Sequence, residues 1–211
     1  MTKSLNIIEQ VLGLDHPDTA TVFNSLAALR KKQGKYTEAE VLYKKSLSIR
    51  EKVLGMEHPH TAQNLNSLAE LYYSQGRYEE ARTLYKKALD IRERVLGVDS
   101  LDTAQSLHDL AILDYTQGRH EEAEVLFKRS LTIIEKILGV EHSKTSLILK
   151  NLAYLYCSQG RYKDAEPLYE RALEIRKRVF GDNHSFTKEI EENLRQIRKK
   201  ARLQNFRTTL H

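Results

Sequence analysis

The sequence contains one cysteine, no tryptophan and three prolines among its 211 residues. A single cysteine, Cys157, cannot form an internal disulfide, and no cysteine and histidine residues have zinc-finger spacing. The longest aliphatic run covers only residues 147–149, and Lys3, Asn6 and Glu9 interrupt the first ten residues. These absences exclude redox and structural zinc chemistry, a membrane span and a signal peptide, so we expect a cytoplasmic protein without a cofactor or metal.

Most of the chain also lacks an excess of acidic or basic residues, although the formal net charge is +5. Residues 193–211 hold six basic side chains and no acidic one, and removing these six from the 34 basic residues leaves 28 against 29 acidic residues. The basic character therefore belongs to the C-terminal tail. We do not expect a nucleic-acid partner, but contact of the tail with RNA, DNA or an anionic membrane is an alternative; the other explanation of its charge is that cations favour the end of a helix.

The nine glycines occur at one regular interval of 21 residues. They lie at positions 13, 34, 55, 76, 97, 118, 139, 160 and 181. The surrounding sequence alternates between two patterns, so the true repeat has 42 residues, and more than half of the positions in residues 43–84 are identical to those in residues 85–126. A repeat of this length indicates an array of stacked units.

Each 21-residue half predicts one α-helix that ends at its glycine, because apolar residues recur at helical spacing and glycine adopts the left-handed conformation that follows a helix. Pro17 and Pro59 fit a first helical turn, and Ser100, His142 and His184 fit the capping position in later repeats. The predicted helices cover residues 3–12, 17–33, 36–54, 59–75, 78–96, 101–117, 120–138, 143–159, 162–180 and 185–203.

The recurring residues of the second complete repeat carry a family resemblance. They are Leu68, Ala69, Tyr72, Gly76, Tyr78, Ala81, Tyr85 and Ala88. This pattern resembles the tetratricopeptide repeat (TPR), and the 42-residue length is similar to that in kinesin light chains and nephrocystin-3. The resemblance implies an all-α, right-handed α-solenoid of antiparallel helix pairs.

The repeat pattern divides the chain into six segments. We expect a half repeat with only a second helix at 1–16, complete repeats at 17–58, 59–100, 101–142 and 143–184, and a capping helix with a basic tail at 185–211. The capping role follows from Arg195, which replaces the alanine of the other repeats at its position. The first segment lacks its partner helix, so its apolar edge predicts self-association or another covering molecule, or a chain cut from a longer array.

Catalytic motifs are missing from the sequence. No glycine has a second glycine at the spacing of a phosphate-binding loop, and neither a nucleophile elbow nor a zinc-protease motif occurs. Equivalent histidines lie one repeat apart, which is too far for shared metal ligation. Cys157 fits a partly buried, unreactive thiol. We therefore predict that the protein is not an enzyme.

The remaining functional surface is the concave face, which the resemblance places on the first helix of each repeat. Polar residues recur there at repeat spacing and form the predicted peptide-binding groove: Asn24, Ser25, Asn66, Ser67, His108, Asp109, Lys150 and Asn151. Amide and hydroxyl groups suit the backbone of an extended peptide. The alternative for each residue is an ordinary solvent-facing helix position.

The aromatic residues of the second helices could suggest stacking with nucleic-acid bases, but we expect them in the core. They are Tyr36, Tyr43, Tyr78, Tyr85, Phe127, Tyr162 and Tyr169. The sequence therefore predicts a non-catalytic scaffold that binds a peptide or a partner protein. The alternatives are a sensor or regulatory region of a larger signalling protein or enzyme, and a cargo adaptor similar to kinesin light chains.

Overall fold

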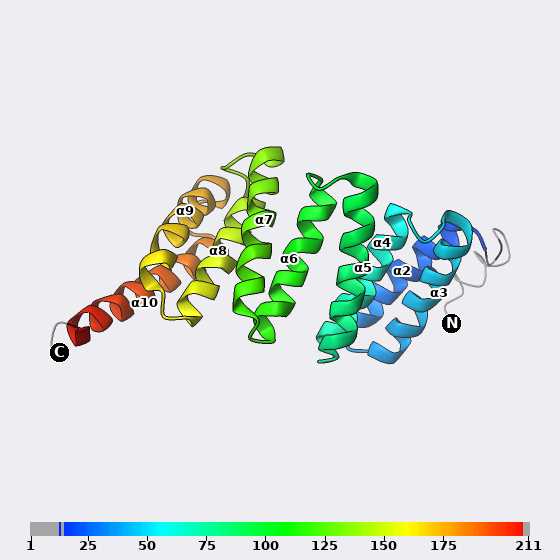
Figure 1. Ribbon diagram of the computed structural model, residues 1–211, viewed down its shortest axis with the longest axis horizontal. Helices are drawn as coiled ribbons and strands as arrows, with labels where there is room; N and C mark the ends of the chain where they lie inside the picture. The colour runs from blue at the N-terminus through cyan, green and yellow to red at the C-terminus, as the bar shows by residue number, and fades with distance from the viewer. Residues whose placement is uncertain (1–12, 14, 209–211) are drawn as a thin grey trace. The chain divides into compact units, whose positions relative to one another are not determined.

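The computed structural model describes Gly13 and residues 15–208, and this part of the chain contains nine α-helices and no β-strand (Figure 1). The helices are α2 (Pro17–Lys32), α3 (Tyr36–Leu54), α4 (Pro59–Ser74), α5 (Tyr78–Leu96), α6 (Leu101–Thr116), α7 (His120–Leu138), α8 (Ser143–Ser158), α9 (Tyr162–Phe180) and α10 (Ser185–Thr208). The all-α prediction is confirmed. The predicted helix at 3–12 lies outside the described residues.

The predicted helix bounds differ from the observed ones at few positions. Helices α2, α4, α6 and α8 each end one residue earlier than predicted. Helix α10 continues to Thr208 instead of ending at residue 203. It continues because its second half is rich in lysine and arginine, which favour helix, and holds no glycine or proline that would end it.

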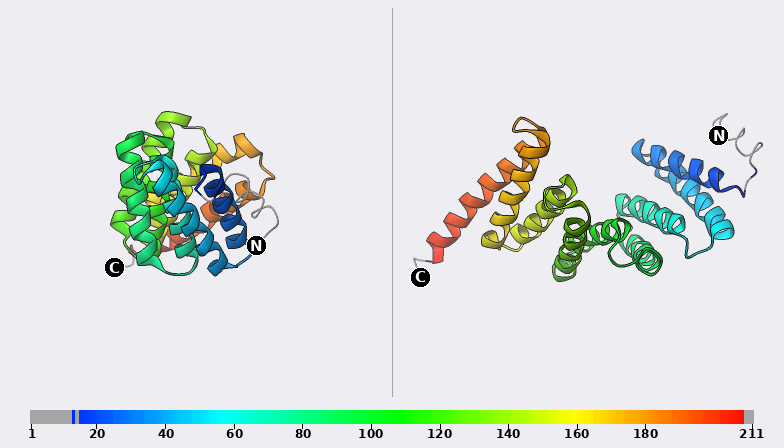
Figure 2. Two further views of the ribbon diagram at one scale, coloured as in Figure 1. Left: turned by 90° about the vertical axis from the view of Figure 1, so that its right-hand side faces the viewer. Right: turned by 90° about the horizontal axis from the view of Figure 1, so that it is seen from above.

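The chain forms two compact units, Met1–Leu113 and Asp114–His211, whose boundary falls within α6. In the first unit, α2 packs on α3, α3 on α4 and α4 on α5. In the second unit, α7 packs on α8, α8 on α9 and α9 on α10. Within each unit, neighbouring helices run antiparallel (Figures 1 and 2). Each unit therefore has the helix-pair organisation that the 42-residue repeat predicts.

The core of each unit combines fully buried alanines with large aromatic side chains. Ala69, Ala81 and Ala88 are inaccessible to solvent, so their helices approach closely. The central aromatic residue of each second helix is buried as predicted: Tyr43, Tyr85, Phe127 and Tyr169. The prediction that Tyr36 belongs to the core is wrong, because it lies at the start of α3 and is 37% exposed. Tyr78 and Tyr162, at the equivalent helix starts, are half-buried.

The two glycine patterns end their helices in different backbone conformations. Gly34 has a φ of 73°, as expected after a helix. Gly55 has φ 90° and ψ 163°, a region that essentially only glycine adopts. A Cβ atom at either position would meet no other heavy atom within 4 Å. The backbone conformation, and not the space available, therefore requires glycine.

Each first helix starts with a cap that the sequence predicts and a second bond that it does not. The His58 ring accepts a hydrogen bond from the backbone N–H of His60 at 3.1 Å, and Pro59 occupies the first helical position. In addition, the Thr61 hydroxyl donates to the carbonyl of Gly55 at 2.8 Å. The same threonine-to-glycine bond recurs in the other repeats, at Thr19, Thr103, Thr145 and Thr187. This bond fixes the path of the chain from each glycine into the next helix.

Candidate functional site

In the first unit, the exposed face of the first helices is mainly polar. Thr21 and Ser25 of α2, Gln63 and Glu70 of α4, and Gln105 of α6 are exposed. These residues follow a spacing of three to four, or of seven, along their helices, so each set lies on one helix face. This surface offers hydroxyl, amide and carboxylate groups to a ligand.

A hydrogen-bonded network joins α4 to α6 beside this face. The Asp109 carboxylate accepts bonds from the side-chain amides of Asn66 at 2.9 Å and Gln105 at 2.8 Å. The Ser106 hydroxyl lies 3.4 Å from Asn66 Oδ1 and accepts a bond from Arg92 Nη1 at 2.7 Å. Burial lowers the pKa of Arg92, and the carboxylates of Asp102 and Asp109 oppose this effect. The network fixes two of the predicted groove residues, Asn66 and Asp109, against each other.

The other predicted residues of α2 and α4 form hydrogen bonds within their own helix or are half-buried. The Ser25 hydroxyl donates to the backbone carbonyl of Thr21 at 3.0 Å, and the Ser67 hydroxyl donates to that of Gln63 at 3.1 Å. Asn24 is half-buried, and its Oδ1 atom is buried without a hydrogen-bond partner among the described residues. Of the four predicted residues on α2 and α4, Ser25 is therefore exposed, whereas Asn24, Asn66 and Ser67 are half-buried.

The structure differs from the sequence analysis at the position shared by Asn66, His108 and Lys150. His108 is only 8% exposed, with its Nδ1 atom 3.5 Å from Asp109 Oδ1. Lys150 Nζ pairs with Glu189 Oε1 of α10 at 3.0 Å. Asn66 and Lys150 thus contact the next first helix, and His108 does not face solvent as predicted. Helix periodicity alone misplaces this position because neighbouring first helices cover its edge.

The second unit presents a more apolar face on α8. Asn151 is half-buried there, Leu147 is 36% exposed and Tyr154 is 56% exposed. The rings of Tyr154 and Tyr115 meet edge to face, with their centroids 5.6 Å apart. The sequence analysis does not identify Tyr154, because its equivalents are Ala28, Glu70 and Ile112 and no repeated residue type marks the position.

One glutamate in each unit anchors a cluster that the sequence analysis also misses. Glu124 of α7 accepts bonds from Lys128 Nζ at 2.6 Å, the Tyr156 hydroxyl at 2.9 Å and Arg161 Nη1 at 2.7 Å. The guanidinium of Arg161 lies 4.0 Å from the centroid of the Tyr156 ring. Burial of Glu124 raises its pKa, but the bonds from Lys128, Arg161 and Tyr156 outweigh it and lower the pKa to about 2.

The first unit repeats this cluster around Glu40. Its carboxylate accepts bonds from Lys44, Tyr72 and Arg77 at 2.7–3.0 Å. The Arg77 guanidinium lies 3.8 Å from the centroid of the Tyr72 ring. Glu40 and Glu124 thus each connect two consecutive helices with the residue that precedes the third, and their role is structural.

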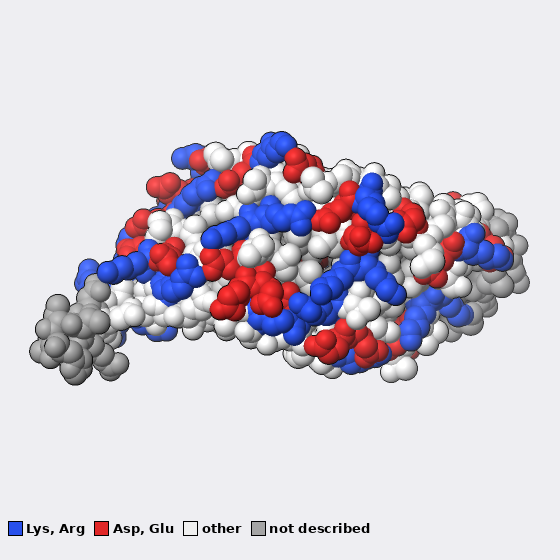
Figure 3. Space-filling model, in the orientation of Figure 1, with Lys and Arg blue, Asp and Glu red and all other residues white. Residues whose placement is uncertain are grey.

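We also searched the described residues for a metal site, a membrane span, a reactive thiol and a nucleic-acid-binding surface. No group of three or more histidine, cysteine, aspartate or glutamate side chains is placed to hold a metal ion there. None of the described helices has the length and apolar character of a membrane span. Burial raises the pKa of Cys157, which disfavours a reactive thiolate. Acidic and basic side chains alternate over the face of each unit that Figure 3 shows, unlike the basic surface of a nucleic-acid-binding protein.

Comparison with known protein families accounts for the repeat. Models described as tetratricopeptide repeat match residues 1–52, 18–94, 60–136 and 145–185. The chain belongs to the tetratricopeptide repeat family. A search of curated protein sequences finds no match.

Solved structures with the TPR fold resemble this TPR protein over most of its length. BtubC (BKLC) from P. vanneervenii is 24% identical with a TM-score of 0.81, and the match covers 94% of this chain and 79% of that one. A putative kinesin light chain with nearly identical TPR-like repeats from Podosopora anserina is also 24% identical, with a TM-score of 0.78 and 92% of each chain covered. Aspartyl phosphate phosphatase F from Bacillus subtilis is 13% identical with a TM-score of 0.72, over 83% of this chain and 44% of that one. These similarities confirm the TPR solenoid fold.

Proposed function

We propose that this TPR protein is a non-catalytic scaffold that holds an extended segment of a partner protein on the exposed faces of its first helices. The observation that carries the proposal is the polar face of α2, α4 and α6, where the Asn66–Asp109–Gln105 network is held rigid beside exposed hydroxyl and amide groups. Rigid polar groups reduce the entropic cost of binding a peptide backbone. Membership in a family whose repeats mediate protein interactions supports the same function.

The two units offer different chemistry to such a segment. Around Ser67, the face of the first unit supplies hydrogen bonds, and Glu70 adds a negative charge. In the second unit, Tyr154 and Leu147 supply apolar contact area. A polar segment fits the face of the first unit, and a segment with aromatic, proline or aliphatic residues fits the face of the second.

Binding of selected peptides to the whole chain tests this function. Peptides are selected from a random library, and their affinities are measured for Ser67→Arg and for the matched variant Thr83→Arg on the exposed side of the second helix α5. An arginine at Ser67 fills the first-helix face, so we expect a loss of about 1–3 kcal/mol in binding free energy. Thr83→Arg leaves that face open. Equal affinities for the two variants would contradict the proposal, provided that both melt like the wild type.

A cargo adaptor similar to kinesin light chains is the alternative that the fold comparisons favour, because one similar structure is a putative kinesin light chain. It differs from a general scaffold in predicting a narrow set of short cargo peptides. Selection of one dominant peptide motif from the library would favour it, and selection of many unrelated sequences would argue against it.

Self-association through the N-terminal edge is a second proposal. Leu29 of α2 is 50% exposed, whereas its equivalents Leu71, Leu113 and Leu155 are fully buried. An apolar side chain exposed at a position that the repeat normally covers favours contact with another molecule. Sedimentation analysis of the whole chain and of Leu29→Lys tests this proposal. Association that the lysine removes supports it, and a wild-type monomer contradicts it.

A further inference from the structure

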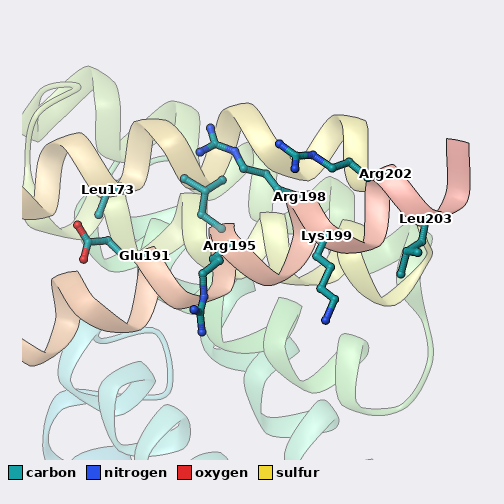
Figure 4. Close-up of a pocket in the computed structure, with 8 residues that line it drawn as sticks. Leu173, Glu191, Arg195, Arg198, Lys199, Arg202 and Leu203 are labelled. Carbon is teal, nitrogen blue, oxygen red and sulfur yellow. The ribbon is translucent and has the colours of Figure 1, made fainter. Parts of the chain in front are cut away.

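A pocket of about 720 Å³ lies over α10 and the adjoining part of α9 in the second unit (Figure 4). Three leucines line it, Leu173 of α9 and Leu194 and Leu203 of α10. Four basic side chains and one acidic side chain surround them: Arg195, Arg198, Lys199, Arg202 and Glu191. The pocket therefore has an apolar base with a mostly basic rim, and it is separate from the first-helix faces discussed above.

The repeat geometry gives this surface the form of a helix-binding site. One repeat earlier, α9 packs along α8, where Leu152, Ala153 and Tyr156 are at most 5% exposed. The equivalent residues of α10, 42 positions later, are Leu194, Arg195 and Arg198. Leu194 is only 5% exposed, and Arg198 faces the preceding helix α9, as Tyr156 faces α7 through its bond to Glu124. Arg195, in contrast, replaces the fully buried Ala153, and its side chain is 80% exposed. The position that a neighbouring helix covers on α8 is thus open on α10, and it carries positive charge.

Part of this positive charge has no ion-pair partner among the described residues. Arg198 reaches toward α9 and pairs with Glu166 at 2.7 Å and with Glu170, so it joins the two helices (Figure 4). Arg195 pairs with Glu192 of its own helix at 2.7 Å. Lys199 and Arg202 form no ion pair with any described residue. The rim therefore retains charge that an acidic ligand would complement.

The spacing of these cations matches a helix as the ligand. Arg195, Lys199 and Arg202 are separated by four and three residues, so they form one stripe along α10, about 10 Å long at 1.5 Å per residue. Carboxylates at the same spacing on a second helix have the same separation. A neighbouring apolar stripe on that helix would pack on the half-buried Leu173 and the 56% exposed Leu203, because Leu194 is buried.

We propose that the α10 pocket binds an acidic amphipathic helix of a partner protein. Apolar side chains of this helix pack on Leu173 and Leu203, and its carboxylates pair with Arg195, Lys199 and Arg202. The long side chain of Arg195, where other repeats have alanine, keeps the bound helix farther from α10 than α9 is from α8. The interaction is therefore reversible and sensitive to salt.

A synthetic peptide serves as the probe. It has about 16 residues, with leucine at every third or fourth position and glutamate on both sides of the leucine stripe, a length at which helix formation becomes favourable. A counterpart has lysine in place of each glutamate. We expect fluorescence anisotropy with the whole chain to show binding of the acidic peptide at least about tenfold tighter than that of the counterpart. Equal affinities would overturn the proposal.

Charge reversal locates the site. Arg195→Glu/Lys199→Glu/Arg202→Glu should weaken binding of the acidic peptide at least about tenfold. The control Lys86→Glu/Lys87→Glu/Lys163→Glu changes the net charge equally at exposed positions of α5 and α9, and it should change affinity less than about twofold. Similar losses of affinity in both variants would show that only the net charge of the protein matters, and this result would overturn the proposal. If the first variant loses helicity, the single exposed change Arg202→Glu makes the same comparison against Lys163→Glu.

Two further measurements separate this site from other basic surfaces. Leu203→Gln should weaken binding even at about 500 mM salt, where electrostatic attraction is screened, because the leucine contact does not depend on charge. Vesicles that contain phosphatidylserine are the second probe. Vesicle binding that the charge reversal removes, together with no binding of the acidic peptide, would show a membrane-binding surface and overturn the proposal.

Discussion

Replacement of Glu124 by glutamine tests how much one half-buried carboxylate contributes to the stability of the second unit. The variant keeps the size of the side chain and removes the charge that Lys128, Tyr156 and Arg161 share. Lys128 is 56% exposed on the same helix, so its pair contributes little. Tyr156 is only 5% exposed, and its bond to a charged acceptor belongs to the stronger class.

We expect Glu124→Gln to lower the free energy of unfolding by about 1–2 kcal/mol, because glutamine retains a weaker acceptor for Tyr156 and loses the attraction to Arg161. For a chain of this size, each kcal/mol lowers the melting temperature by about 2–4 °C. Circular dichroism melts and denaturant titrations measure both quantities. The control is Glu122→Gln, which makes the same change at an exposed position of α7.

The pH dependence gives this prediction a second readout. The folded pKa of Glu124, about 2, lies below the ordinary value of 4.5, so the ionised carboxylate stabilises the folded state. This contribution is complete above pH 4.5 and is lost as the pH falls toward 2. The stability difference between the wild type and Glu124→Gln should therefore shrink over this range. A difference that stays constant with pH, or an equal loss in Glu122→Gln, would refute the reasoning.

Two further changes test the core and the repeat boundary. Tyr85→Ala should lower the free energy of unfolding by about 3–5 kcal/mol, because the residue is only 3% exposed. Asn66→Ala should lower it by about 1 kcal/mol, because it removes the bond to Asp109. Equal losses in denaturant titrations would show that the buried and exposed helix faces are assigned wrongly. Gly55→Ala should lower the free energy of unfolding by about 1–3 kcal/mol, because alanine does not favour the backbone conformation of Gly55. Met56→Ala, at the neighbouring 63% exposed position, should lower it by less than about 0.5 kcal/mol. A Gly55→Ala variant as stable as the wild type would contradict the argument from backbone conformation.

The helices were predictable because glycine, proline and the apolar pattern act locally. Gly34 and Gly55 each end a helix through their own backbone conformation, and the buried positions of Tyr43 and Tyr85 follow from helical spacing. Tyr36 was misplaced because it lies in the first turn of α3, where fewer neighbours cover a side chain.

Much of the candidate site was not predictable, because it depends on contacts between repeats. Tyr72 bonds to Glu40, 32 residues earlier, and Asn66 bonds to Asp109, 43 residues later. Tyr72 belongs to the repeat pattern, but the residue types at the positions of Glu40, Asn66 and Asp109 vary between repeats, so the 42-residue pattern does not mark these contacts. His108 is buried because the position is covered in the folded unit, which helix periodicity alone does not reveal.

The most direct test of the account is the position of a bound peptide on the folded chain. A photoreactive benzophenone amino acid is placed singly at Ser25, Ser67 or Asn151 on first helices, and at Thr83 or Thr132 on exposed faces of second helices. A peptide selected on the whole chain is added, irradiated and analysed for covalent adducts. Adducts at the first-helix positions, with none at Thr83 and Thr132, are the predicted result. Adducts confined to the second-helix positions would contradict the proposal that the first helices form the binding surface.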